Sequence, residues 1–524
     1  MIDVGSPEGS RAPRLVYSKE TEANARRTTT YTALSHCWGA LKNAVCTTEE
    51  NLHSHLAELD FDSLSKTCRD AISITRKLGI RYLWIDSICI VQDNAEDWER
   101  EAVMMSAIYS HAYLTIAAAS ASDSSGGCCI DDPLKTTTLE ICLENHCKGM
   151  PSKGYIRYPE YRRDHFLDSP LHTRGWVLQE VILSRRTVYF TADQMFWLCR
   201  SYRHAEDGIK PSAVGFQTQA PSKRKTETGG MYWDRNTRRL KRMVHPGMLA
   251  TYDLSKPGRA WETWWEWVQN FRSRQLTRAS DRFAALAGLT KLYQSATGDR
   301  SLAGLWERSI LRDLFWEVEP SIPAETRMTN CAPEILAKSE DEAQAWRVLT
   351  KRDSRRQLKN IPTWTWFAAE GLEIKSPNHP DIKGRHDQWE YKARYLGAHL
   401  LWSGEELTSS LLKATLVLRG RLIKLQLFDI CTLRPFDCKC GSEPEYRVDV
   451  AWDYFPPNGV SFWGLLIAEE LDWDKRVQAR KLLILRKTGH SYDEYQRQGI
   501  TKDGRFHKVH FCISDLEERA VWLV

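Results

Sequence analysis

The sequence lacks the long apolar segments that would place the protein in a membrane or a secretory pathway. No apolar run approaches the ~20 residues that a membrane-spanning helix needs, and the longest, 113–121, is about half that length. The polar opening MIDVGSPEGSRAP has no apolar core of a signal peptide. We therefore expect no membrane association and a cytoplasmic location, with the nucleus as an alternative because of basic clusters downstream.

Familiar nucleotide, nucleophile and metal motifs are also missing. The chain contains no P-loop, no G-x-G-x-x-G fingerprint and no G-x-S-x-G elbow. Its 14 cysteines include Cys128-Cys129 and Cys438-x-Cys440, but none has the paired C-x-x-C spacing of a structural zinc site. We predict reduced, mostly buried thiols, no metal site and no resident cofactor.

The net positive charge is small for a protein that would bind nucleic acid through its surface. A net charge of +5 over 524 residues is too small an excess unless it is concentrated, so a nucleic-acid partner is not expected. The apolar share of 42% and the charged share of 27% are those of a globular protein with two or three domains. The 21 tryptophans indicate broad packed interfaces or stacking sites.

Short apolar strands alternate with amphipathic helices up to about residue 205. Strands are predicted at 14–17, 31–35, 82–91 and 113–119, and helices at 61–78 and from Asp93 or Asn94 onward. This alternation predicts an α/β fold with a largely parallel sheet flanked by helices. Sites in such sheets form beyond the carboxyl ends of the strands, where Ser35, His36 and Asp86 stand.

Composition divides the chain into four parts. We predict an α/β domain at 1–205, a basic polar linker or excursion at 206–247, a helical region at 248–360 and a β-rich region at 361–524. Strands of the last region are expected at 414–427, 460–468, 482–486 and 506–514. Basic clusters such as SKRK in the linker could serve nuclear import or a nucleic-acid contact, although a solvated loop is the favoured interpretation.

The stretch from Leu171 to Phe190 predicts a short helix followed directly by a strand. Trp176 and Glu180 are four residues apart, so they share one helix face, as packing residues or as a pocket wall with an acid in it. Asp86 follows an apolar strand, where it could orient a ligand or cap the turn before Gln92.

Three stretches together resemble the HET, or heterokaryon incompatibility, domain family of filamentous fungi. They are YTALSHCWG at 31–39, RYLWIDSICIVQDNAEDWEREAVMMSAIYSHA at 81–112 and TRGWVLQEVILSRRTVYF at 173–190. The stretches SDRFAALAGL, LAGLWERSILRDLFW and PTWTWFAAEG are similar to regions often attached to HET domains. The resemblance implies a role in fungal self/non-self recognition and regulated cell death. It also implies a TIR-like fold, because HET domains are distantly related to TIR domains, some of which cleave NAD.

The resemblance also implies site residues. Trp176-Val-Leu-Gln-Glu180 is similar to the Trp-x-x-x-Glu pattern of TIR enzymes, whose glutamate is catalytic, and Ser35 is similar to a serine that ends a TIR strand. His36 departs from the family, which usually has tyrosine after this serine, so it carries no family-wide role. His36 and Cys37 also point to opposite faces and do not form a catalytic pair.

NAD is the substrate that this comparison implies. Its cleavage passes through a cation-like ribosyl state, for which one carboxylate, Glu180, is enough. Trp176 or Trp38 could stack on a ring of the dinucleotide, and Asp86 could orient it. Arg174, or the pair Arg185-Arg186, could bind the pyrophosphate.

Two other interpretations stay open. Glu180 could pair with an arginine and only fix the helix–strand joint, in which case the protein would be a non-catalytic interaction or oligomerisation module. It would then act as a homo-oligomer or through a protein partner of the incompatibility system. A gene-cluster-specific accessory protein is the remaining alternative.

Overall fold

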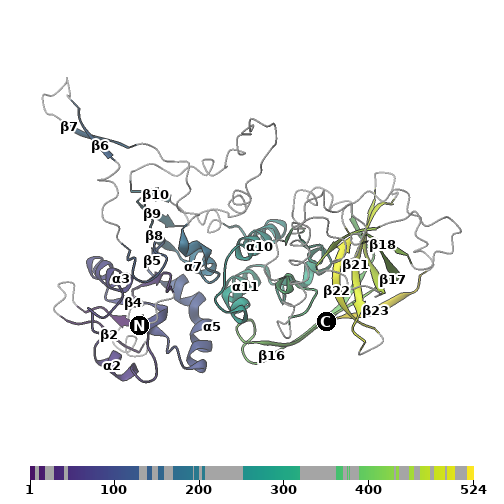
Figure 1. Cartoon of the computed structure of the whole chain (residues 1–524), viewed down its shortest axis with the longest axis horizontal. Helices are drawn as coiled ribbons and strands as arrows, with labels where there is room; N and C mark the ends of the chain where they lie inside the picture. Colours follow the sequence, from purple (N-terminus) through teal and green to yellow (C-terminus); the bar gives the residue numbers. More distant parts are fainter. Residues whose placement is uncertain are drawn as a thin grey trace, which may run out of the picture. The chain divides into compact units, whose positions relative to one another are not determined.

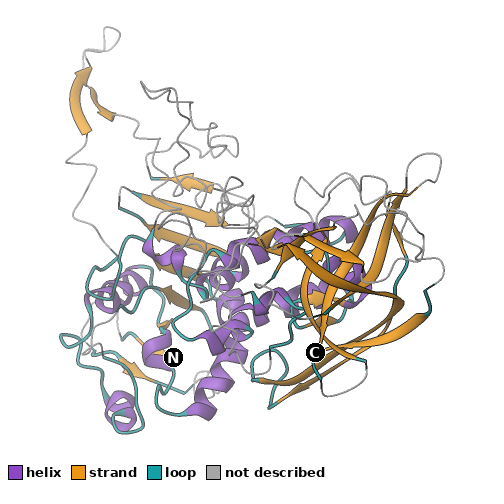
Figure 2. Ribbon diagram, turned by 45° about the vertical axis from the view of Figure 1, so that its right-hand side comes forward, coloured by secondary structure: helices purple, strands orange, loops and turns teal. Residues whose placement is uncertain are grey.

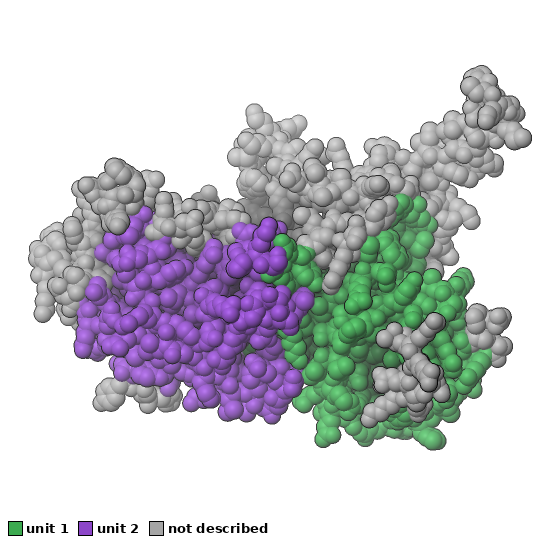
Figure 3. Space-filling view, turned by 180° about the vertical axis from the view of Figure 1, so that it is seen from behind, with its two compact units in different colours: residues 1–254, 266–291 green, residues 255–265, 292–524 purple. Residues whose placement is uncertain are grey.

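A computed structural model of the protein describes residues 1–5, 11–17, 29–39, 45–128, 138–143, 152–157, 169–192, 194–199, 203–206, 252–318, 361–369, 374–375, 377, 389–429, 432–435, 448–453, 461–471, 477–489, 493–501 and 516–524. The chain divides into two compact units (Figure 3). Unit 1 comprises 1–254 and 266–291, and unit 2 comprises 255–265 and 292–524. Most of the predicted linker, 207–247, lies outside the described residues, as do 319–360 of the helical region and the strand expected at 506–514.

Unit 1 contains an eight-stranded sheet with helices on both faces (Figures 1 and 2). Its strands are β1 (Ile2–Asp3), β2 (Arg14–Leu15), β3 (Tyr31–Ser35), β4 (Tyr82–Trp84), β5 (Leu114–Ala118), β8 (Arg186–Phe190), β9 (Met195–Cys199) and β10 (Arg203–Ala205). The pair β6 (Thr138–Leu143) and β7 (Ser152–Arg157) forms a separate two-stranded sheet. The helices are α2 (Leu52–Ala57), α3 (Lys66–Lys77), α4 (Asp86–Cys89), α5 (Ala95–His111), the 3₁₀ turn η1 (Pro170–Thr173) and α7 (Val177–Leu183).

The sheet has a parallel centre and antiparallel margins. Its strand order is β10-β9-β8-β5-β3-β4-β1-β2, and β4, β3, β5 and β8 run parallel to one another. The chain leaves β3 for β4 on one side and then crosses to β5 on the other side. Such a reversal sends the two crossover helices to opposite faces, because parallel crossovers are right-handed.

Alternation along β5 confirms this two-faced packing. Ile116 and Ala118 belong to one apolar cluster, which contains Cys68 and Ile72 of α3. Ala117 belongs to a second cluster, which contains residues of α7. Because successive strand residues point to opposite faces, α3 and α7 cover opposite faces of the sheet. The predicted α/β fold with a parallel core is thereby confirmed for this unit.

The continuous strand predicted over 82–91 is wrong. The strand ends at Trp84, and Asp86–Cys89 form the short helix α4. The Asp86 carboxylate accepts a hydrogen bond from the Ser87 amide, and the Gln92 side chain donates to the Asp86 carbonyl. An unbroken apolar run is compatible with either element when both are buried, so these polar contacts decide the conformation.

Other local predictions hold. Asn94 caps α5, as predicted, by accepting from the Asp97 amide. Gly79, with φ of 68°, follows the C-cap residue Leu78 and ends α3. The helix predicted from residue 61 begins only at Lys66, after Ser65 caps it. The helix and strand predicted within 171–190 are α7 and β8.

Long helices follow in the region predicted to be helical. They are α10 (Pro257–Arg272) and α11 (Ala284–Thr297), with the 3₁₀ turn η2 (Ala279–Arg282) between them. Trp261, Trp264, Trp265 and Val268 form a stripe on α10 and are buried. Asp313 accepts hydrogen bonds from the indoles of Trp261 and Trp265, at 2.7 and 3.1 Å, within unit 2. No described helix combines the length and apolarity needed to cross a membrane.

Unit 2 contains a nine-stranded, mostly antiparallel sheet whose strands curve (Figure 2). The strands are β15 (Trp389–Tyr391), β16 (Arg394–Trp402), β17 (Leu411–Asp429), β18 (Thr432–Pro435), β19 (Val448–Trp452), β20 (Phe462–Leu471), β21 (Val477–Lys487), β22 (Glu494–Thr501) and β23 (Glu518–Leu523). β17 pairs with both β20 and β23, and β21 and β22 connect these two strands, so the sheet closes on itself. Smaller elements are β11 (Ser301–Leu302), β12 (Leu305–Trp306), η3 (Glu307–Ser309), α12 (Ile310–Asp313), β13 (Glu317–Val318), η5 (Trp366–Ala368) and β14 (Ile374–Lys375). The predicted β-rich C-terminal region is confirmed.

Candidate functional site

Polar residues gather where β3 and β4 end and α7 begins. Ser35 is the last residue of β3, and Asp86 follows β4 by two positions. The connections from β3 and β5 leave the sheet at this edge toward opposite sides, the place where open parallel sheets form ligand sites. Glu180 comes from α7, which covers the face toward which Ser35 and Cys37 point.

Glu180 is a buried acid with an unsatisfied oxygen. Its side chain is held away from solvent, with 5% of the residue exposed. Burial raises the pKa of Glu180 to about 7; the Ser35 hydroxyl lowers it, Asp86 raises it, and Arg174 and the Tyr109 hydroxyl lower it. Among the described residues, neither Glu180 Oε2 nor Ser35 Oγ has a partner in hydrogen-bonding geometry. A carboxyl group in this state exchanges its proton near neutral pH.

Arg174 contacts the backbone that follows β3. Its Nη1 donates to the backbone carbonyl of His36, and the residue itself is only partly buried. Cys37 lies on the same face as Glu180; burial raises the pKa of its thiol, with Arg174 opposing. A thiol kept protonated in this way is a weak nucleophile, so Cys37 acts as a small buried side chain.

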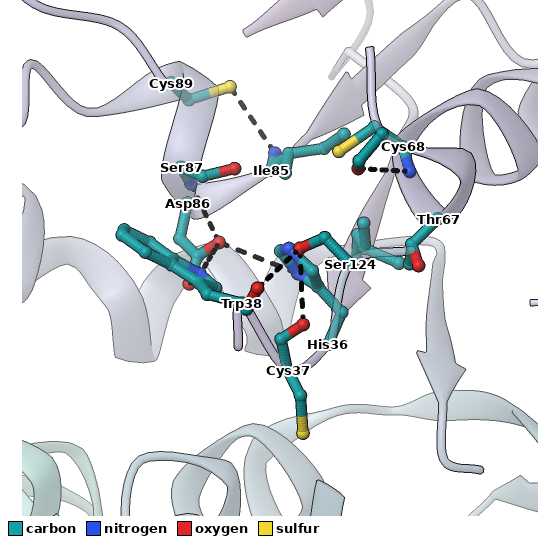
Figure 4. A network of polar contacts seen from close by, with 12 residues as sticks. His36, Cys37, Trp38, Thr67, Cys68, Ile85, Asp86, Ser87, Cys89 and Ser124 are labelled. Atoms are coloured by element: carbon teal, nitrogen blue, oxygen red, sulfur yellow. Dashed lines mark hydrogen bonds and ion pairs between the residues drawn. The ribbon is translucent and has the colours of Figure 1, made fainter. Parts of the chain in front are cut away.

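Trp38 and Asp86 form a pair on the other side of the strand end (Figure 4). The Trp38 indole Nε1 lies 3.0 Å from each carboxylate oxygen of Asp86. The Ser124 hydroxyl donates to the carbonyls of Cys37 and Trp38, at 3.3 and 3.1 Å, and so holds the turn in place. Asp86 is therefore both the first residue of α4 and the acceptor that positions an aromatic ring, and 19% of its side chain remains exposed.

His36 lies beside this pair as a neutral imidazole. Its Nδ1 is 3.8 Å from Asp86 Oδ1, but burial lowers the pKa of His36, with Asp86 opposing. The Cys37 thiol points away from the His36 ring (Figure 4). This arrangement agrees with the prediction that His36 and Cys37 do not form a catalytic pair.

Two of the predicted ligand contacts lie elsewhere in unit 1. The Trp176 indole donates to Asp281 at 3.4 Å and packs edge-on against Trp98, with ring centroids 6.2 Å apart. Arg186 begins β8, at the opposite edge of the sheet from Ser35, and its guanidinium lies over the Tyr113 ring. These contacts leave Trp38 and Arg174 as the aromatic and the cation at the site.

Tyr109 lies on the buried side of α5 and was not among the predicted site residues. Its hydroxyl donates to the Leu34 carbonyl at 3.0 Å and interacts electrostatically with Glu180. Helical periodicity identified its burial, but no sequence pattern indicated which carboxyl group it would face.

The described side chains offer acid–base and anion-binding chemistry. Within the part of the chain that the structure describes, no group of three or more His, Cys, Asp or Glu side chains could hold a metal ion. The predicted residues that meet at the site are the buried acid Glu180, the Arg174 guanidinium, the oriented Trp38 indole and the Ser35 hydroxyl.

Comparison with known protein families identifies the domain that carries this site. Residues 31–180 match the family model described as Heterokaryon incompatibility protein (HET), a range that begins with β3 and ends at Glu180. This match confirms the resemblance over those residues and supports a heterokaryon incompatibility-related protein. No curated protein and no solved structure matches the chain. The TIR-like form of the fold stays a prediction.

Proposed function

We propose that the HET domain at 31–180 acts in fungal non-self recognition and regulated cell death by hydrolysing NAD, with Glu180 as the catalytic carboxylate. The observation that carries this proposal is the buried Glu180 carboxyl group, whose pKa burial raises to about 7, beside the Ser35 hydroxyl. Both stand at the edge of a parallel sheet where ligand sites form.

The reaction needs few catalytic groups. The bond between ribose C1′ and the nicotinamide nitrogen breaks, its electron pair goes to the ring nitrogen, and water adds to C1′ with release of one proton. Nicotinamide leaves as a neutral base, so no general acid is required. An ionised Glu180 would stabilise the positive charge that develops on the ribose. The Trp38 ring, which Asp86 orients, would stack on an aromatic ring of the dinucleotide.

The test is nicotinamide release from NAD by the full-length protein and by a Glu180→Gln variant. Because the substitution removes the charge that meets the transition state, we expect a rate loss of at least about 100-fold. Release by the wild-type protein should rise with pH through about 7, since only the carboxylate form is active. Protein concentration is varied as well, because assembly could be required for turnover.

The matched control is Glu50→Gln, which removes an exposed carboxylate from the same unit. It should release nicotinamide at the wild-type rate. Equal release from the wild-type protein and the Glu180→Gln variant, at every concentration, would contradict the assignment of Glu180.

A second function is favoured by the burial of the acid itself. With 5% of Glu180 exposed, a substrate reaches it only after the surrounding segments move. The domain would then signal by homo-oligomerisation or by binding a protein partner, without turnover. Concentration-dependent assembly without NAD loss, together with cell death that Glu180→Gln does not change, would support this function over hydrolysis.

A further inference from the structure

A buried arginine outside the matched HET range reaches the site. Arg274 belongs to unit 1 and is 9% exposed. Its Nε donates to Asn270 Oδ1 at 2.8 Å, and its Nη1 donates to the backbone carbonyl of Arg174 at 3.2 Å. Burial lowers the pKa of Arg274 to about 10, with Tyr189 and Glu180 opposing, so the guanidinium remains charged within range of the Glu180 carboxyl group.

The segment that carries Arg274 forms backbone hydrogen bonds with the residues that precede α7, the helix of Glu180. The Gly175 amide donates to the Gln275 carbonyl at 2.7 Å, and the Gln275 amide donates to the Thr173 carbonyl at 2.6 Å. A Cβ atom at residue 175 would lie 2.5 Å from Leu276 Cδ2, so a larger residue here would require the Leu276 side chain to move. These contacts fix the position of Arg274 relative to α7.

Within the described part of the chain, no carboxylate lies at ion-pair distance from the Arg274 guanidinium, and Glu180 acts on it only from a longer range. Among the described residues, Arg274 forms hydrogen bonds with neutral acceptors and no ion pair with a carboxylate. Arg174, next to it, has none either. Buried charges in proteins are normally paired, and an unpaired one indicates a missing ion or ligand. Glu180 forms no ion pair with either arginine, and burial raises the pKa of its carboxyl group to about 7, which disfavours its charged form.

We propose that Arg274 and Arg174 together bind a phosphate group of the ligand that occupies this site. Two guanidinium groups beside one partly ionised acid favour an anion, and the fork of each guanidinium matches phosphate oxygens. The phosphate site rests on these contacts alone. Its assignment to the diphosphate of a dinucleotide rests on the proposed function.

Binding is measured on full-length protein that carries Glu180→Gln, so that turnover does not interfere. The probes are ADP-ribose, inorganic pyrophosphate and nicotinamide riboside. The last of these contains no phosphate group. Adding Arg274→Gln should weaken ADP-ribose or pyrophosphate binding by about tenfold or more, because a charge-assisted contact is lost. Binding of nicotinamide riboside should not change.

Arg278→Gln is the matched control, since Arg278 is exposed four residues further along. It should leave all three affinities unchanged. Arg274→Lys keeps the charge but loses the fork, so it should weaken binding less than Arg274→Gln, and it serves if Arg274→Gln does not fold. The melting temperature of unliganded Arg274→Gln should not fall, because the substitution removes an unpaired buried charge.

Two results would overturn the phosphate site. One is unchanged affinity for ADP-ribose and pyrophosphate in Arg274→Gln. The other is a lower melting temperature of the unliganded variant with equal weakening of all three probes, as a purely structural arginine would give. Binding of pyrophosphate without binding of ADP-ribose would retain the phosphate site and remove the dinucleotide, and with it the proposed function.

Discussion

Glu180→Gln should change how the stability of unit 1 depends on pH, whether or not the protein is an enzyme. Burial raises the pKa of Glu180 from its ordinary value of 4.5 to about 7. The folded protein therefore holds this proton between these two pH values, whereas the unfolded chain has released it. Stability from this group is fully present below pH 4.5 and is lost as pH rises through 7.

The magnitude follows from the two pKa values. Each pH unit between them corresponds to about 1.4 kcal/mol, so the full effect is about 3 kcal/mol. Between pH 5 and pH 8, most of this interval is crossed. The unfolding free energy of the wild-type protein should therefore fall by about 2 to 3 kcal/mol relative to that of Glu180→Gln, because glutamine does not titrate.

The assay is urea unfolding read by pulsed hydrogen exchange of peptides from β3 and β5, which report on unit 1 alone. Comparison with the variant cancels the other titrating groups, and Glu50→Gln controls for loss of an exposed carboxylate. A wild-type minus variant difference that stays constant from pH 5 to pH 8, or that increases with pH, would refute the raised pKa. It would also remove the neutral-pH acid on which the proposed function depends.

Two further substitutions test packing and hydrogen bonding, one within each unit. Gly175→Ala should destabilise unit 1 by about 1 to 3 kcal/mol, because its Cβ would lie 2.5 Å from a leucine methyl carbon, as exchange protection of β3 peptides would measure. Gly258→Ala in unit 2, where a Cβ would have no atom within 4 Å, should leave the protection of β21 peptides unchanged. Asp313→Ala should destabilise unit 2 by at least about 3 kcal/mol, because it removes the buried carboxylate that accepts hydrogen bonds from the indoles of Trp261 and Trp265. Urea unfolding followed through β21 peptides tests this, and an unchanged midpoint would contradict the structural role of Asp313.

Local patterns in the sequence predicted much of the fold because they act over a few residues. Helical periodicity and a capping Asn94 predicted α5, and the apolar run that ends at Ser35 predicted β3. The same reasoning failed at 82–91, where α4 interrupts the run. Apolar residues buried on every side satisfy a strand and a short helix equally well. The helical turn is accompanied by local hydrogen bonds of Asp86 with Ser87 and Gln92 and by a long-range one from Trp38.

The sequence by itself determined the alternation of strands and helices, the HET resemblance and the identity of Glu180 as the acid to test. Tertiary structure alone decided that Glu180 is buried beside Ser35, that Trp176 packs against Trp98, and that Arg274 approaches from 100 residues beyond Arg174. The spacing of apolar residues along the sequence indicates which side of a helix or strand is buried. Which charges meet inside the fold depends on contacts between distant segments, and the free energy of a buried charge depends on those contacts.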